Sequence, residues 1–156
     1  MILVLGIGND ILSDDGIGPV LVRNLSEVIQ DPDIRFETAS AGGLDLMELL
    51  SGYDKVILID AIKSRDGIPG TVYFLRPGNF RETMHLTNLH DISFLTALSM
   101  AERLGLPMPQ EITIIAVEIL QDQVFSDSFS EPLQERYPQL LKQVSEYLIS
   151  EWIYNE

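Results

Sequence analysis

The fold of this chain is decided by residues 6–16, which read GIGNDILSDDG. They follow an apolar strand at residues 2–5 and lead into a helical pattern. A strand–loop–helix segment of this kind usually holds a phosphate, because glycines let backbone N–H groups point at an anion and the helix dipole favours negative charge. Here the segment carries three carboxylates, Asp10, Asp14 and Asp15, which repel a phosphate and attract a cation. The sequence therefore predicts a metal ion where similar folds hold a nucleotide.

The composition excludes several classes of function. The 156 residues suffice for a single domain over residues 1–156 with one hydrophobic core. There are no cysteines, so disulfides, thiolate metal ligands and cysteine nucleophiles are all excluded. The formal net charge of −14 makes nucleic acid and anionic membranes poor partners. Since we find neither a signal peptide nor an apolar run that could span a bilayer, we expect a cytoplasmic protein with no nucleic-acid and no membrane partner.

Alternating apolar segments predict the fold class. Strands are expected at residues 2–7, 34–38, 56–59, 71–75 and 112–117. Apolar residues at helical spacing predict helices at residues 17–28, 44–50, 92–104 and 132–152, the last with a kink at Pro138. This alternation indicates an α/β protein, a three-layer α/β/α sandwich around a five-stranded mixed sheet.

One short connection sets the direction of a strand. About nine residues separate the third and fourth strands, whereas a parallel crossover needs roughly a dozen or more. The fourth strand is therefore expected to run antiparallel to the others. The chain must then return to the carboxyl edge of the sheet before the helix near Asp91 begins, which places His90 at that edge.

Three side chains are thus expected at one edge of the sheet: Asp15 after the first strand, Asp60 at the end of the third, and His90. Ligands of open α/β sheets bind outside the carboxyl ends of the strands, where the strand order reverses. Two carboxylates and one imidazole are a reasonable ligand set for Zn²⁺ or Ni²⁺ and leave positions open for water or substrate.

Each of these residues also has a simpler explanation. Asp14 and Asp15 taken alone are better read as helix caps, and Asp10 as an Asx-turn residue. For Asp60, a hydrogen bond to backbone amides is as good an explanation as a functional role. A lone histidine at a helix start usually caps the helix or lies at the surface. His90 is a candidate ligand only because the predicted topology places it beside Asp15 and Asp60.

Other motifs add little to this set. We do not expect His85 to be a ligand, and Asp91 fits a helix start or a partner for His90. The glycine pattern from Gly6 lacks the third glycine of a dinucleotide-binding loop, because Ile11 stands there. A flavodoxin-like nucleotide or flavin protein is therefore disfavoured. The pair Gly42-Gly43 fits a close backbone approach at the same edge or a simple turn.

These motifs, taken in order, resemble those of the nickel–iron hydrogenase maturation endopeptidases. Residues 5–9 and 14–18 resemble the N-terminal motif of that family, residues 59–61 its second motif, and His90 before an amphipathic helix its third. The chain departs from the family pattern at Ala41 and Leu44 around the glycine pair, and at Asp91 where glutamine is common.

The resemblance implies a phosphorylase/hydrolase-like α/β/α sandwich with one antiparallel strand. It also implies that Asp15, Asp60 and His90 are the metal-binding and catalytic residues. The implied reaction is removal of a C-terminal extension from the nickel-loaded precursor of a hydrogenase large subunit, with nickel carried by that substrate and zinc or another divalent ion possible in vitro.

Within that reaction we expect substrate-positioning roles for residues near the metal: Gly6, Gly8, Asn9, Gly42 and Gly43. Asp14 is a candidate general base. The alternative function is a non-enzymatic nickel-binding or chaperone module for hydrogenase assembly on the same fold.

Overall fold

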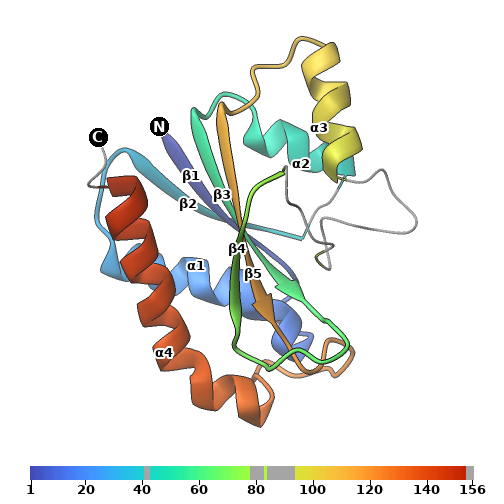
Figure 1. The fold of residues 1–156 in the computed structure, drawn as a ribbon, viewed down its shortest axis with the longest axis vertical. Coiled ribbons are helices and arrows are strands. Elements are labelled where there is room, and N and C mark those ends of the chain that lie inside the picture. Colours follow the sequence, from blue (N-terminus) through green and yellow to red (C-terminus); the bar gives the residue numbers. More distant parts are fainter. Residues whose placement is uncertain (41–42, 78–82, 84–93, 154–156) are drawn as a thin grey trace.

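A five-stranded sheet divides the molecule into two helical layers (Figure 1). The computed structural model describes residues 1–40, 43–77, 83 and 94–153. The strands are β1 (Ile2–Ile7), β2 (Ile34–Ala39), β3 (Lys55–Ile62), β4 (Val72–Leu75) and β5 (Glu111–Glu118). Their order in the sheet is β2-β1-β3-β5-β4, with β4 antiparallel to β5 and the remaining neighbours parallel. The mixed five-stranded sheet predicted from the sequence is confirmed.

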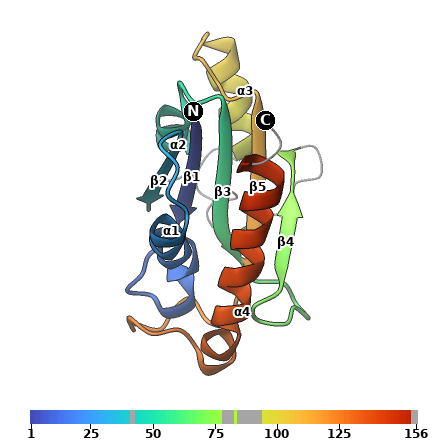
Figure 2. The same ribbon diagram turned by 90° about the vertical axis from the view of Figure 1, so that its left-hand side faces the viewer.

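The two faces of the sheet are covered by different helices, as Figure 2 shows in a view onto one of these faces. Helices α1 (Ile17–Val28) and α4 (Glu131–Leu148) pack on one face, and α2 (Gly43–Leu50) and α3 (Phe94–Arg103) on the other. The central strands β1, β3 and β5 are buried along nearly their whole length, because apolar side chains project into both layers. These three layers confirm the predicted α/β/α sandwich.

The antiparallel direction of β4 follows from its short connection to β3. The sequence between them forms turns rather than a helix, and Gly70 N donates a hydrogen bond of 2.9 Å to the carbonyl of Glu118. The chain therefore folds back beside β5 at once, and the expectation drawn from loop length is confirmed.

Helix α3 runs toward the amino edge of the sheet. Just after it, Gln110 N donates to the carbonyl of Asp54, and Gly52 N donates to that of Pro107, both at 2.9 Å. Both contacts lie at the start of β3, so the helix delivers the chain to the beginning of β5. This direction is the one that the strand topology required.

The start of α1 differs from the expectation. Residues Ser13–Gly16 form a 3-10 turn, η1, and the cap residue of α1 is Gly16, which makes no side-chain capping bond. Neither Asp14 nor Asp15 caps the helix, so the capping interpretation was wrong for both. Their carboxylates are used elsewhere, as described below.

The C-terminal helix continues past Pro138 through Leu148 and then widens into a π-helical turn, η3 (Ile149–Ile153). Trp152 in that turn is buried against the α1 and α4 layer. Within the part of the chain that the structure describes, no helix is long and apolar enough to cross a bilayer.

Candidate active site

The loops that follow β1, β3 and β5 meet at the carboxyl edge of the sheet (Figure 1). The chain leaves β1 toward β2 on one side, whereas β3 pairs with β1 on the other side. This reversal of strand order leaves room between the two connections, which is where ligands bind in open α/β sheets. Asp15 lies in the turn η1 that follows β1, and Asp60 lies near the end of β3. Both predicted carboxylates therefore belong to segments at this edge.

Two glycines allow the turn η1 and the start of α1 to lie directly on the strands. A Cβ at Gly18 would stand 2.6 Å from the carbonyl oxygens of Ile59 and Ile7, and a Cβ at Gly8 would stand 2.1 Å from that of Asp15. Such distances are too short for any side chain. Glycine at these positions allows η1, which carries Asp15, to contact β3, which carries Asp60.

Asp15 is 4% exposed. Its Oδ2 accepts a hydrogen bond of 2.9 Å from the backbone N–H of Asn9. This bond spans the loop between β1 and η1, so the loop conformation and the orientation of the carboxylate depend on each other. A charged hydrogen bond to a backbone amide is among the stronger polar contacts in proteins.

Asp60 is completely buried near the end of β3. Its Oδ1 accepts a hydrogen bond of 2.9 Å from the N–H of Ala61. Because side chains alternate along a strand, Asp60 shares its face with Leu58 and Ile62, which pack in the layer of α2 and α3. That is the layer in which α3 begins, at Phe94.

The donor set of Asp15 and Asp60 fits a divalent cation. Carboxylate oxygens are common ligands of such ions. Over residues 1–40, 43–77, 83 and 94–153, no three His, Cys, Asp or Glu side chains gather as a metal site. His90, the third predicted ligand, and His85 lie outside the described residues, as does Asp91.

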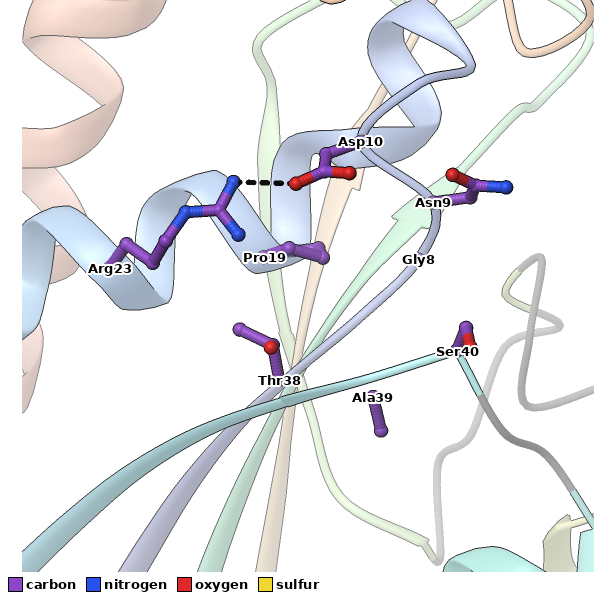
Figure 3. A pocket seen from close by; sticks show the side chains of 8 residues that line it. All are labelled: Gly8, Asn9, Asp10, Pro19, Arg23, Thr38, Ala39 and Ser40. Atoms are coloured by element: carbon purple, nitrogen blue, oxygen red, sulfur yellow. Dashed lines mark hydrogen bonds and ion pairs between the residues drawn. The ribbon is translucent and has the colours of Figure 1, made fainter.

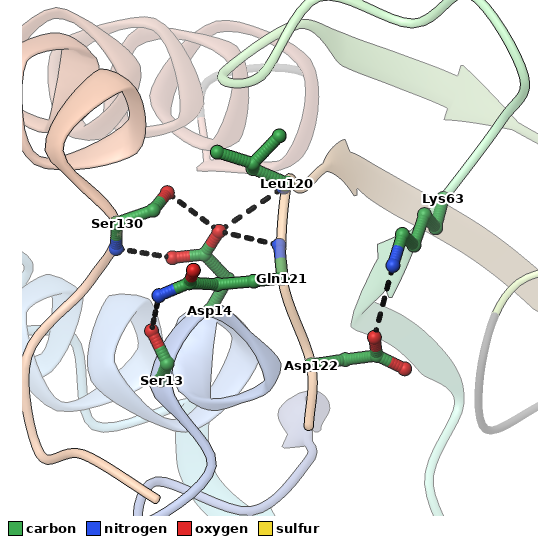
Figure 4. Close-up of polar contacts among 7 residues, drawn as sticks. All are labelled: Ser13, Asp14, Lys63, Leu120, Gln121, Asp122 and Ser130. Atoms are coloured by element: carbon green, nitrogen blue, oxygen red, sulfur yellow. Dashed lines mark hydrogen bonds and ion pairs between the residues drawn. The ribbon is translucent and has the colours of Figure 1, made fainter. Parts of the chain in front are cut away.

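Asp14 has a different role from its neighbour (Figure 4). It is fully buried, and its carboxylate accepts four hydrogen bonds. Oδ2 receives the N–H of Leu120 at 3.0 Å, the N–H of Gln121 at 3.1 Å and the hydroxyl of Ser130 at 2.7 Å. Oδ1 receives the N–H of Ser130 at 2.7 Å. We call these four residues the Asp14 cluster. These four donors hold Asp14 as an acceptor within the fold, which argues against the role of general base expected from the sequence.

Beside Asn9 lies a hollow of about 320 Å³ (Figure 3). It is lined by Gly8, Asn9, Asp10, Pro19, Arg23, Thr38, Ala39 and Ser40. Asp10 accepts a hydrogen bond of 2.9 Å from Arg23 at its rim, and both side chains are about half exposed. The Asx turn assigned to Asp10 is instead made by Asn9, whose Oδ1 accepts the N–H of Ile11 at 3.2 Å.

The predicted substrate-positioning residues separate into groups. Gly8 and Asn9 line the hollow, whereas Gly6 does not. A Cβ at Gly6 would stand 2.4 Å from the carbonyl oxygen of Gly18, so this glycine serves the packing of α1 on β1. Gly42 lies outside the described residues, and Gly43 begins α2.

Glu118 is a buried carboxylate that the sequence interpretation missed. It ends β5, is completely buried, and its Oε1 accepts hydrogen bonds from the N–H of Ser64, at 3.1 Å, and from its hydroxyl. Its neighbour across the sheet is Ile62, two residues beyond Asp60. The signal that singled out Asp60, an acidic residue at the end of an apolar strand, applies equally to Glu118.

Comparison with known proteins identifies relatives over most of this fold. The family model described as hydrogenase maturation protease matches residues 19–147. The chain is 30% identical to the hydrogenase expression/formation protein HoxM of Azotobacter vinelandii, with 94% of this chain and 72% of that protein covered. It is 31% identical to the hydrogenase 2 maturation protease of Escherichia coli K12, with 74% and 71% covered.

The structural comparison agrees. The hydrogenase maturating endopeptidase HybD from E. coli superposes with a TM-score of 0.72 at 27% identity, covering 97% of this chain and 93% of the other. A hydrogenase maturation protease HycI from Thermococcus kodakarensis KOD1 shares the fold with a TM-score of 0.68, covering 94% and 91% at 23% identity. The chain therefore belongs to the hydrogenase maturation protease family.

Proposed function

We propose that this protein is an endopeptidase that removes a C-terminal extension from the precursor of a nickel–iron hydrogenase large subunit. The observation that carries the proposal is the pair of buried carboxylates, Asp15 and Asp60, at the carboxyl edge of a fold that belongs to a protease family. Since the relatives are maturation proteases, a peptide bond of a hydrogenase precursor is the matching substrate. The reaction is proposed to take place in the cytoplasm.

In this proposal the nickel ion is part of the substrate, bound to the precursor before cleavage. Asp15, Asp60 and His90 are the residues that would hold it. A divalent ion at a scissile bond polarises the carbonyl or lowers the pKa of a bound water toward about 7. Zinc or another divalent ion is a candidate for the same residues in vitro.

The chain supplies orientation and burial. The N–H of Asn9 fixes Asp15 and the N–H of Ala61 fixes Asp60, so both carboxylates are held before substrate arrives. Groups positioned in this way do not have to be ordered during the reaction. The hollow beside Asn9 is the place where we propose that the precursor chain enters, with the backbone at Gly8 along one side.

The test is incubation of the purified protein with the nickel-loaded precursor and with the nickel-free precursor, followed by mass measurement of the large subunit. We expect a shortened subunit in the nickel-loaded sample. Asp15→Asn and Asp60→Asn should each lower the rate at least 100-fold, whereas Asp122→Asn should not change it. Asp122 pairs with Lys63 at 3.2 Å on a neighbouring loop and serves as the matched control.

Two outcomes would overturn the proposal. Unchanged cleavage by folded Asp15→Asn and Asp60→Asn would remove the assigned site. Binding of the precursor without any change in its mass would favour the alternative, a non-enzymatic nickel-binding or chaperone module.

A further inference from the structure

The Asp14 cluster joins two parts of the chain that are far apart in the sequence, the turn η1 and the connection between β5 and α4. Asp14 lies in η1, Leu120 and Gln121 follow β5, and Ser130 precedes α4. The hydrogen bonds span 106 to 116 residues along the chain. A single buried carboxylate thus fixes the turn η1 relative to the whole connection between β5 and α4.

The choice of partner at Ser130 shows that this contact prevails over a local alternative. Ser130 is the N-cap residue of α4, where a serine hydroxyl usually accepts a hydrogen bond from the first helical turn. No such capping bond is present. The hydroxyl instead donates to Asp14 Oδ2, and the Ser130 N–H donates to Oδ1.

Further contacts hold the same two segments together beside the cluster. Ser13 N donates to the carbonyl of Ser126 at 2.9 Å, and Ser126 N donates to that of Ile11 at 3.0 Å. The Ser13 hydroxyl donates to the carbonyl of Ser128 and accepts from the side-chain amide of Gln121, both at 2.9 Å. The loop from Ile11 to Ser13 is therefore hydrogen-bonded at both of its ends to the connection between β5 and α4.

Asp15 is the next residue after Asp14 in a turn of four residues. A turn this short has little stability of its own, so tertiary contacts determine where it lies. Asp15 is oriented from one side by Asn9 N–H, and the backbone that carries it is fixed from the other side by the Asp14 cluster. The position of the Asp15 carboxylate therefore depends on both sets of bonds.

We infer that Asp14 is a positioning residue for peptide cleavage: its buried carboxylate, through the amides of residues 120, 121 and 130, holds Asp15 where it meets the substrate-bound metal. This inference rests on the proposed function. It assigns to Asp14 a role in the rate of the reaction rather than in binding or proton transfer. A displacement of about 1 Å at a reacting group can cost roughly 100-fold in rate.

The experiment measures kcat and KM for the nickel-loaded precursor in five proteins: the unaltered protein, Asp14→Asn, Ser130→Ala, Ser130→Thr and the control Asp122→Asn. Asp122→Asn is the matched control, since it is the same substitution in the connection between β5 and α4, from which the donors to Asp14 come, and it alters an ion pair to Lys63. The folded fraction of each protein at the assay temperature is measured by circular dichroism, and kcat is expressed per folded molecule.

We expect Asp14→Asn to lower kcat 10- to 100-fold with KM changed less than twofold, because an amide presents one acceptor oxygen to donors that now occupy two. Ser130→Ala should lower kcat severalfold, and Ser130→Thr, which keeps the hydroxyl, should restore it. Asp122→Asn should behave like the unaltered protein.

The outcomes distinguish a failure of the proposed function from a failure of the inference about Asp14. If the unaltered protein does not cleave the precursor, the proposed function fails. If the unaltered protein cleaves it and Asp14→Asn retains its kcat per folded molecule, the inference fails while the function stands. A rise in KM with constant kcat would also overturn the inference, because Asp14 would then support substrate binding. If Asp14→Asn does not fold, Ser130→Ala and Ser130→Thr test the inference instead. Equal kcat values for these two variants would then overturn it.

Discussion

Asp10 and Asp14 lie in the same connection between β1 and α1, yet they are held in opposite ways. Asp10 is about half exposed and pairs with one side chain, Arg23, on the adjacent helix. Asp14 is fully buried and is bound by backbone and hydroxyl donors from two distant segments. The difference shows that a cluster of acidic residues in a loop is not one site. Burial and the donors around each carboxylate decide what each one does.

The largest effect should come from removing the buried carboxylate. Asp14→Ala leaves three amides and one hydroxyl without their acceptor. We expect the free energy of unfolding to fall by about 3–5 kcal/mol, since buried donors without a partner cost roughly 1–3 kcal/mol each and the costs within one hydrogen-bond network do not simply add. Urea unfolding followed by tryptophan fluorescence measures this loss. A loss below about 1 kcal/mol would contradict the role of the cluster.

A smaller effect is expected at the serine of the cluster. Ser130→Ala removes one hydroxyl donor but keeps the amide that binds Oδ1 of Asp14. The expected loss is about 1–2 kcal/mol, near the value of one hydrogen bond to a charged group. Combining it with Asp14→Ala tests whether the two act together. Additive losses in the double variant would show that the hydroxyl and the carboxylate are energetically independent.

The exposed aspartate should matter least to stability. Asp10→Ala breaks an ion pair whose two side chains are 50% and 47% exposed. Surface pairs of this kind contribute about 0.2–1 kcal/mol, so the midpoint of urea unfolding should shift only slightly. A loss as large as that of Asp14→Ala would remove the distinction between the two residues.

The smallest expected difference between Asp10 and Asp14 is in how the energy of their interactions depends on salt concentration. The coupling energy between Asp10 and Arg23, taken from a double-mutant cycle, should fall toward zero in about 1 M NaCl, because exposed charges are screened. The loss caused by Asp14→Ala should stay nearly constant, since its partners are enclosed. Equal salt dependence of the two would mean that water and ions reach the Asp14 cluster.

The sequence predicted the architecture well because the architecture rests on local patterns. Continuous apolar runs indicated the buried strands, and the short connection after Ile62 indicated the direction of β4. The sequence singled out Asp60 as a candidate because an acidic residue at the end of such a run is costly without a partner. The same rule could have found Glu118, which ends β5 in the same manner.

The roles of the loop aspartates could not be predicted in the same way. The donors that bind Asp14 come from residues 120–130, and no local pattern links those positions to the loop after β1. The 3-10 turn η1, which moves the helix cap to Gly16, depends on those tertiary contacts too. The placement of His90 remains a prediction, because the segment before α3 lies outside the described residues.

The sequence distance across the Asp14 cluster also bears on how the protein is made. A ribosome releases the chain from its N-terminus, so the loop with Asp14 emerges long before Ser130, which lies 116 residues later. During that interval the donors that enclose the carboxylate do not yet exist. A nascent chain therefore encloses the Asp14 carboxylate only after Ser130 has been synthesised, so this turn at the carboxyl edge of the sheet is among the later parts of the described fold to be fixed.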